Sequence, residues 1–257
     1  MRWIRYEQSG KVRHGILDEA GDRVAEVQGG LFDGGTPTGQ RHAFADVKLL
    51  PPVIPPTFYA AGLNYMTHIR RIPGRSPPPN ADIGYRANNA LIASGEDIVV
   101  PGESAGVLQA EGELVLVVGK KVKHVSEDEA MGCVFGYSIG NDVSERVWQK
   151  SDRTLWRAKN SDTFKPMGPW IETEGEIDKM YTRIRINGKE VASFPTNDMV
   201  FSASQFIASM TRVLTLYPGD VIWMGTDEPT PDMRAGDLCE VEITGVGTLS
   251  NRLVAER

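Results

Sequence analysis

Hydrophobic and polar residues alternate along much of this chain, which is typical of strands that bury one face. The first fifty residues contain three such runs, at 2–7, 14–19 and 23–28, separated by glycine-containing turns. Later runs, LVLVV at 114–118 and VIWM at 221–224, are wholly apolar, as strands buried on both faces are. The pattern therefore predicts a strand-dominated protein of the α+β class.

Helical periodicity is confined to short segments. Between residues 203 and 214, Phe206, Ile207, Met210 and Leu214 recur at spacings of three and four, which predicts an amphipathic helix with a buried stripe. Ser126 followed by Glu129 forms a capping-box signature, which predicts the start of a second, short helix. No internal repeat or low-complexity tract is present.

Prolines divide the chain. Two Pro-Pro pairs occur between residues 49 and 65, where they stiffen the backbone and remove hydrogen-bond donors. We expect a domain boundary near residue 53. A second irregular stretch, IPGRSPPPNADIGYRANN at 72–89, is typical of a mobile loop or lid rather than of a sheet, and we expect residues 73–80 to close over a site.

Composition narrows the function classes. The chain has 257 residues, 40% of them hydrophobic, and a net charge of −6. Its scattered basic residues argue against nucleic-acid binding, and no apolar run is long enough to span a membrane. The first residues lack the apolar core of a signal peptide, so we expect a cytoplasmic protein with small-molecule partners. Cys133 and Cys239 fit neither a disulfide framework nor a zinc site.

An acidic pair opens the apolar run at 114–118. Within a strand, Glu111 and Glu113 would point to the same side, with Gly112 between them. Two carboxylates held this close repel each other unless a cation lies between them, and Mg²⁺, Mn²⁺ and Ca²⁺ prefer oxygen ligands. Asp142, at the end of another strand-like run, is a candidate third ligand. A solvated strand entrance would produce the same spacing.

Other catalytic motifs are incomplete or absent. Residues 136–140, GYSIG, match the nucleophile elbow of α/β-hydrolases, in which a histidine follows the serine. Here every histidine precedes Ser138, so no base of the required order exists. The sequence also lacks a phosphate-binding P-loop, a dinucleotide fingerprint and a zinc-protease motif.

Six motifs in order give a resemblance to a known family. They are GLNYMTH at 62–68, EGELVLVVGKKV at 111–122, FGYSIGNDVSERVWQ at 135–149, AKNSDTFKPMGPW at 158–170, TLYPGDVIWMGT at 215–226 and GDLCEVEITGVGTLSN at 236–251. This order resembles the fumarylacetoacetate hydrolase family. The resemblance implies a mixed β-sandwich roll over residues 54–257, a small amino-terminal β-domain over residues 1–53, and a homodimer.

The resemblance also implies roles for individual residues. It makes Glu111, Glu113 and Asp142 the ligands of Mg²⁺ or Mn²⁺, with Ca²⁺ as a further option. It makes Lys159 the active-site lysine, which would neutralise developing enolate charge.

Four further positions would contact substrate by the same resemblance. Gln149 and Thr163 match residues that line the site in relatives. Gly225 and Thr226, after the run at 221–224, match a pair that offers a backbone or hydroxyl donor.

His68 matches the histidine that activates water in hydrolytic relatives. Many relatives have glutamate three residues later to orient it, whereas this chain has Arg71. Asp227 or Glu228 is a candidate replacement for that carboxylate. Asn64 and Tyr65 are expected to support the turn that presents the histidine.

The implied activity is that of a divalent-metal-dependent enzyme acting on a small 2-oxo or enol acid from aromatic catabolism. It would hydrolyse a C–C bond of an acylpyruvate-like substrate, or isomerise a substrate through an enolate, as relatives of the 2-hydroxyhepta-2,4-diene-1,7-dioate isomerase type do. A decarboxylase of an oxaloacetate-like or muconate-derived acid and a non-catalytic binding protein of the same fold remain alternatives.

Overall fold

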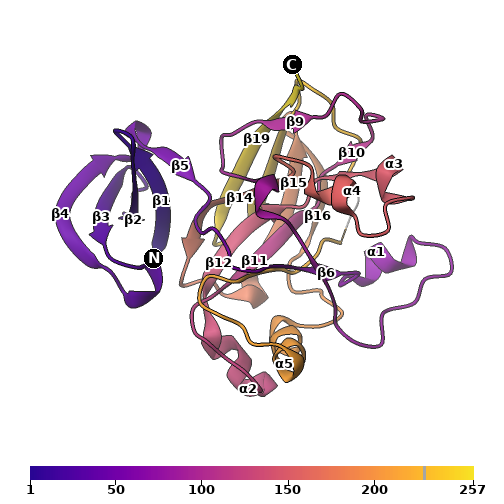
Figure 1. Cartoon of the computed structure of the whole chain (residues 1–257), viewed down its shortest axis with the longest axis horizontal. Helices are drawn as coiled ribbons and strands as arrows, with labels where there is room; N and C mark the ends of the chain where they lie inside the picture. Colours follow the sequence, from indigo (N-terminus) through magenta and orange to yellow (C-terminus); the bar gives the residue numbers. More distant parts are fainter. Residues whose placement is uncertain (228–229) are drawn as a thin grey trace.

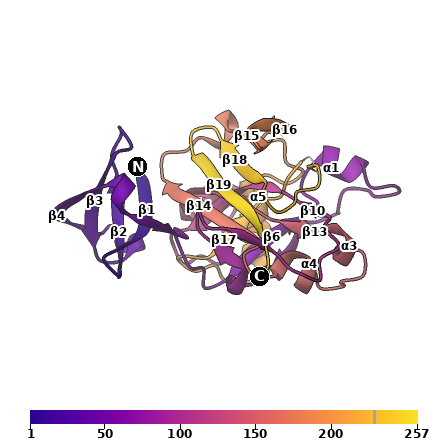
Figure 2. The ribbon, with the colours of Figure 1, turned by 90° about the horizontal axis from the view of Figure 1, so that it is seen from above.

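The computed structural model describes residues 1–227 and 230–257, and strands dominate it as predicted (Figure 1). The amino-terminal strands form a curved sheet to one side of the main body (Figure 1 and Figure 2). They are β1 (Arg2–Gln8), β2 (Lys11–Leu17), β3 (Arg23–Gln28), β4 (Thr36–Ala43) and β5 (Lys48–Leu50). This sheet has its own small core, made by Ile4, Tyr6, Leu17 and Val24. The three strands predicted in this segment are confirmed.

The main body is built on a mixed sheet that continues from the amino-terminal one. Its order runs from β1 through β14, β12, β11, β17 and β6 to β7, and β1 joins β14 through only two residue pairs. The additional strands are β6 (Phe58–Gly62), β7 (Asp82–Tyr85), β8 (Leu91–Ile92), β11 (Gly112–Val118), β12 (Val134–Asn141), β14 (Lys165–Glu172) and β17 (Val221–Trp223). Strand β11 is buried along its whole length, as its uninterrupted apolar run predicted.

A second sheet packs against β11 and β12. Its strands, in the order β16, β15, β18, β19 and β9, are β16 (Lys189–Pro195), β15 (Tyr181–Ile186), β18 (Leu238–Ile243), β19 (Gly247–Ala255) and β9 (Ile98–Val100). A two-stranded ribbon pairs β10 (Leu108–Gln109) with β13 (Ser144–Glu145). The main core lies between the sheets, where Leu114 and Leu116 of β11 meet Ile184 and Val241 of the second sheet. The arrangement confirms the expected mixed two-sheet fold, because opposed apolar strand faces must bury each other.

The helices are short and lie at the ends of strands. They are α1 (Met66–Arg70), α2 (Glu127–Ala130), α3 (Arg146–Gln149), α4 (Trp156–Asn160) and α5 (Ala203–Val213), with 3₁₀ turns at Leu31–Asp33, Phe44–Asp46, Asn88–Ala90, Met131–Cys133 and Ile177–Lys179. Helix α5 buries Phe206, Ile207 and Met210, and α2 begins with the predicted capping box. In the described part of the chain, no helix has the length and apolar character needed to cross a membrane.

The irregular stretch at 72–89 is only partly a loop. Residues 82–85 form β7, which pairs with β6 at the edge of the main sheet, so the expectation that this stretch lies outside the sheet is wrong there. Tertiary pairing with β6 supplies backbone partners that the proline-rich sequence pattern does not reveal. Residues 73–80 do lack helix and strand.

Candidate functional site

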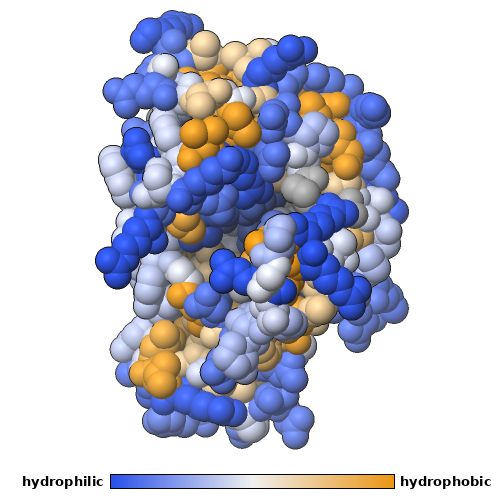
Figure 3. All heavy atoms as spheres, turned by 90° about the vertical axis from the view of Figure 1, so that its right-hand side faces the viewer, coloured by the Kyte–Doolittle hydropathy of each residue, from blue (hydrophilic) through white to orange (hydrophobic). Residues whose placement is uncertain are grey.

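A cavity of about 250 Å³ opens where α1, α3 and α4 surround the ends of β11 and β12. Figure 3 shows the face of the molecule on which α1 and α3 lie, where hydrophilic residues surround a hollow. The lining includes eight of the nine predicted site residues. Its residues are Ala61, Gly62, Leu63, Asn64, His68, Ile72, Arg75, Arg86, Glu111, Glu113, Asp142, Gln149, Leu155, Lys159, Gly225 and Thr226. Most sequence-predicted residues therefore meet in one place.

The strand geometry explains why the acidic residues face this cavity. Gly112 lies against the second sheet, where an added Cβ would be 2.8 Å from Val241 and 3.0 Å from Ile184. Because neighbours in a strand alternate, Glu111 and Glu113 project to the opposite side. The backbone N–H of Asp142 donates to the carbonyl of Glu111 at 2.9 Å, which extends the β11–β12 ladder and brings the third carboxylate alongside.

The three carboxylates form one buried cluster. Glu111, Glu113 and Asp142 are all buried, and one oxygen from each lies within 4.8 Å of the others. The donors are oxygens only, which is the set that Mg²⁺, Mn²⁺ or Ca²⁺ favours. Within the described residues this is the one such group found.

Protonation differs sharply between the two glutamates. Burial, reinforced by the charges of Asp142 and Glu111, raises the pKa of Glu113 to about 8. Burial opposes ionisation of Glu111 too, but Lys159 and Arg146 outweigh it and lower its pKa to about 2. Only Glu113 therefore holds a proton at neutral pH, and a bound cation would displace that proton.

Lys159 is placed by the short helix α4. The carboxylate of Asp152 accepts hydrogen bonds from the N–H groups of Arg157 and Ala158, at 2.7 and 2.9 Å, and so caps the start of the helix. At its other end, the buried Nζ of Lys159 donates to Glu111 at 2.5 Å and to Asp142 at 2.7 Å. Two of its three N–H donors are used in this way, which leaves the third for the cavity.

His68 lies on α1 at the cavity wall. Burial lowers its pKa, although Glu111 opposes the effect, so the imidazole is neutral at pH 7 and can accept a proton. Its buried Nδ1 has no hydrogen-bond partner within residues 1–227 and 230–257. The backbone N–H of Arg71 donates to the carbonyl of His68 at 3.3 Å. Asp227 and Glu228 were the two candidate orienting carboxylates. Asp227 is buried, and its charge partly opposes the lowering of the His68 pKa. Glu228 lies outside the described residues.

The turn before His68 is braced as expected. The side chain of Asn64 accepts from the N–H of Phe201 at 2.9 Å and donates to the carbonyl of Met224 at 3.1 Å. The hydroxyl of Tyr65 donates to the carbonyl of Thr196 at 2.5 Å. The bond to Met224 ties the turn before α1 to the strand end that precedes Gly225, and the other two tie it to the segments at Thr196 and Phe201.

The substrate-binding candidates divide into three kinds. Gln149 and Thr226 line the cavity, and the buried hydroxyl of Thr226 has no partner in the described chain. Gly225 also lines it, but its N–H donates to Glu113 at 2.8 Å and orients that carboxylate. Thr163 is not among the lining residues, and its hydroxyl instead accepts from the N–H of Val99 at 2.8 Å.

Three basic residues at the site were not anticipated from the sequence. Arg86 pairs with Asp142 at 2.8 Å, and the fully buried Lys165 pairs with the other oxygen of Asp142 at 2.7 Å. Arg146 pairs with Glu111 at 2.7 Å and donates to the amide oxygen of Gln149 at 2.8 Å. Lys165 could have been found as a charge at the start of an apolar strand, whereas Arg86 carries no sequence signal.

Ser138 has a structural role. It is completely buried, and its hydroxyl donates to the carbonyl of Trp170 at 2.8 Å. The glycines on either side allow close packing: a Cβ on Gly136 would lie 2.6 Å from the carbonyl oxygen of Glu172, and one on Gly140 would lie 2.6 Å from Trp223. The motif is part of strand β12, and the order of the histidines had argued only against a nucleophilic serine.

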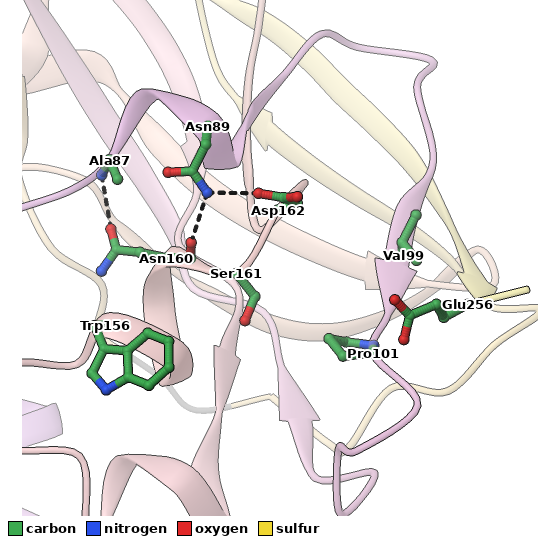
Figure 4. Close-up of a pocket in the computed structure, with 9 residues that line it drawn as sticks. All are labelled: Ala87, Asn89, Val99, Pro101, Trp156, Asn160, Ser161, Asp162 and Glu256. Atoms are coloured by element: carbon green, nitrogen blue, oxygen red, sulfur yellow. Dashed lines mark hydrogen bonds between the residues drawn. The ribbon is translucent and has the colours of Figure 1, made fainter.

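A second, larger cavity of about 520 Å³ has Trp156 and Asn160 of α4 among its lining residues (Figure 4). Asn160 and Asn89 span its wall, with the side-chain amide of Asn89 donating to the carbonyl of Asn160 and to Asp162. No group of metal-ligating side chains lines it in the described chain. Size alone would favour this cavity, but the chemistry lies in the smaller one.

The fold and the smaller cavity together define an enzyme with an acid–base site on a two-sheet β-scaffold. The family model for the fumarylacetoacetate (FAA) hydrolase C-terminal domain matches residues 57–254, and a model described as Rv2993c-like, N-terminal, matches residues 1–52. The chain belongs to the fumarylacetoacetate hydrolase family.

Individual relatives have different activities. Protein Rv2993c of Mycobacterium tuberculosis is 37% identical over 93% of this chain and 91% of its own length. The 2,4-didehydro-3-deoxy-L-rhamnonate hydrolase of a Sphingomonas species is 32% identical over 96% and 94%. The mitochondrial oxaloacetate tautomerase FAHD2A of Homo sapiens is 33% identical over 82% and 70%.

Among solved structures, the 5-carboxymethyl-2-hydroxymuconate delta-isomerase of Mycobacterium smegmatis has a TM-score of 0.91 and 32% identity, with all of both chains covered. Relatives of this chain are thus hydrolases, isomerases and tautomerases, and the chain is an enzyme of that family.

Proposed function

We propose that this protein is a divalent-metal-dependent enzyme acting on a small 2-oxo or enol acid from aromatic catabolism. The observation that carries the proposal is the buried cluster of Glu111, Glu113 and Asp142, with Lys159 bonded to two of its members and His68 on the same cavity. Burying charged groups lowers the stability of the folded protein, and such clusters are typical of functional sites.

The donor set fits Mg²⁺ or Mn²⁺, with Ca²⁺ as a further option. The three carboxylates supply oxygens only, and burial together with the charges of Asp142 and Glu111 raises the pKa of Glu113. A divalent ion held there would act as a Lewis acid toward the oxygens of a 2-oxo acid. Binding of such an ion is expected to raise the melting temperature, because only the folded protein presents the three ligands together.

The remaining chemistry falls to side chains. In hydrolysis of an acylpyruvate-like substrate, neutral His68 would take a proton from water as the water oxygen attacks the distal carbonyl. The C–C bond then breaks to give a carboxylic acid and the enolate of pyruvate, which picks up a proton. The ammonium of Lys159, held in a buried position, would stabilise the negative charge on the enolate oxygen.

Isomerisation is the second candidate and uses the same enolate without water. The observation in its favour is that Nδ1 of His68 has no described hydrogen-bond partner to fix the ring. A general base works best when a second group holds its tautomer and orientation. Decarboxylation of an oxaloacetate-like or muconate-derived acid would also use the charge stabilisation by Lys159.

Product analysis distinguishes these outcomes. The metal-stripped protein would be incubated with acylpyruvates, oxaloacetate and a hydroxymuconate-type dienoate, with and without Mg²⁺ or Mn²⁺. Mg²⁺-dependent loss of diketone absorbance with release of pyruvate supports hydrolysis, and a shifted absorbance with a single product of the same mass as the substrate supports isomerisation. No metal binding by calorimetry, together with an unchanged Glu113→Ala variant, would refute the proposal and favour a non-catalytic binding protein of the same fold.

Catalysis belongs to residues 54–257 in this proposal, and residues 1–53 form the small amino-terminal β-domain. In support, every described residue that lines the site lies between residues 61 and 226. We also propose a homodimer, on the strength of the family resemblance, and a cytoplasmic location. Light scattering after size-exclusion chromatography tests the dimer.

A further inference from the structure

A tight turn follows directly after the helix that carries His68. The N–H of Ile72 donates to the carbonyl of Ile69, which is almost completely buried, and the N–H of Arg75 donates to the carbonyl of Ile72 at 3.1 Å. Pro73 occupies the second position of this turn and Gly74, with φ of +72°, the third. This combination is typical of a type II turn, so the sequence IPGR fixes the backbone of Arg75 relative to α1.

The turn places Arg75 at the wall of the active-site cavity. Arg75 and Ile72 line the cavity together with His68, and Arg75 is exposed to solvent, which puts it at the mouth. The proline and glycine therefore serve a purpose beyond connecting α1 to β7. They hold a long cationic side chain beside the opening.

Among the described cationic residues that line this cavity, Arg75 differs from the others in having no carboxylate of the described chain beside it. Lys159 and Arg86 are held by the carboxylate of Asp142. The guanidinium of Arg75 makes no ion pair or side-chain hydrogen bond in the part of the chain that the structure describes. A guanidinium is charged at all physiological pH values and presents paired N–H donors that match a carboxylate.

The charges deeper in the site favour an anionic ligand. The three carboxylates of the cluster lie among four basic side chains, those of Arg86, Arg146, Lys159 and Lys165. A divalent ion would make this interior more positive still. A 2-oxo acid supplies one carboxylate to the interior, and Arg75 remains to attract a second anionic group at the mouth.

We propose that Arg75 selects dicarboxylate substrates by binding the carboxylate farther from the 2-oxo group. This proposal rests on the proposed function, because it assumes that the 2-oxo acid end lies at the acidic cluster. It narrows the substrate class from small 2-oxo acids to those with a second, terminal carboxylate.

The competing explanation is that Arg75 is an ordinary solvated cation on a loop. Arg70 gives a matched control, because it is exposed, lies five residues away at the end of α1 and does not line the cavity. If net surface charge alone attracts anions, Arg70→Gln and Arg75→Gln will have equal effects. If Arg75 binds the distal carboxylate, only the second substitution matters.

The experiment uses calorimetry on the Mg²⁺-loaded full chain with 2-oxoadipate and its terminal methyl ester. Neither probe has the diketone needed for C–C hydrolysis, and they differ only in the distal charge. We expect the wild-type protein and Arg70→Gln to bind the diacid about tenfold more tightly than the ester, as a charge-assisted pair at a partly solvated site provides. Arg75→Gln should bind both probes with the affinity that the wild-type protein has for the ester.

Retention of the diacid preference in Arg75→Gln overturns the proposal, as does equal binding or no binding of the two probes by the wild-type protein. Melting temperatures of both variants, which change exposed side chains, verify that each is folded. Turnover on acylpyruvates is measured separately. If the wild-type protein shows no diacid preference but turns over acylpyruvates, only the role of Arg75 is refuted, whereas a diacid preference without any turnover refutes the proposed reaction.

Discussion

Metal binding should release a proton from Glu113. In the metal-free protein the pKa of this carboxyl is about 8, because it is buried beside Asp142 and Glu111. A carboxylate must be ionised to coordinate a metal ion. Glu111 has a pKa of about 2. Burial opposes ionisation of Asp142, but the charges of Arg86 and Lys159 hold its pKa well below the usual range. Neither residue therefore has a proton to lose at neutral pH.

The expected magnitude follows from the pKa. With a pKa of about 8, Glu113 is roughly 90% protonated at pH 7 and roughly 10% protonated at pH 9, so binding should release about 0.9 proton at the first pH and about 0.1 at the second. The apparent metal affinity should rise about tenfold for each pH unit below pH 8 and level off above it.

Calorimetric titration of Mg²⁺ in buffers with different ionisation enthalpies counts the released protons. Glu113→Gln is the control, because glutamine has the same shape as glutamate and cannot ionise. Since this variant should bind Mg²⁺ more weakly, it is titrated with higher Mg²⁺ concentrations. Lys165, whose pKa burial lowers to about 7, contributes equally to both proteins and cancels in the difference. A difference near zero at pH 7, or an affinity independent of pH between 6 and 8, would refute this reasoning.

Four other outcomes are expected. His68→Ala should reduce hydrolysis by at least about 10²-fold while calorimetry shows unchanged Mg²⁺ affinity, and equal losses of both would contradict a general-base role. Lys159→Met should cost every activity the parent has, since the enolate is common to them; near-wild-type turnover on every substrate would exclude a shared enolate. Gly140→Ala should lower the free energy of unfolding by about 1–3 kcal/mol, because its Cβ would overlap the completely buried ring of Trp223, whereas Gly132→Ala, which has open space, should be neutral in the same urea titration. With a chelator present, the melting temperature of the wild-type protein should fall relative to that of Glu113→Gln as pH rises from about 5 to 8. The reason is that the folded state retains the Glu113 proton, whereas the unfolded chain loses it near the usual pKa. A constant difference would argue against the raised pKa.

Local sequence patterns predicted several elements, including the strand next to which the acidic pair lies. The apolar run at 114–118 forms β11, the capping box at Ser126 begins α2, and the three- and four-residue spacing in residues 203–214 forms α5. Such patterns succeed because the period of a helix or strand fixes which side chains share a buried face. The same rule placed Glu111 and Glu113 on one side of their strand.

Local patterns did not show which segments distant in the sequence pack beside each other. Strand β7 forms from a proline-rich stretch because β6 offers its edge, and Thr163 bonds to the backbone of Val99 rather than facing the cavity. Whether a polar side chain faces a ligand or a backbone group depends on which segment packs beside it, and nothing within the Thr163 segment specifies that neighbour.

The sequence by itself determined the strand-rich class, the order of the elements and the side of β11 on which the acidic pair lies, because each depends on the spacing of nearby residues. The tertiary structure decided which charges surround that pair. Arg86, Arg146 and Lys165 come from separate segments and reach Asp142 or Glu111 only after the chain has folded. Electrostatic energy in a buried site depends on distances of a few ångströms between such groups, so the ionisation states of Glu111 and Glu113 are properties of the fold.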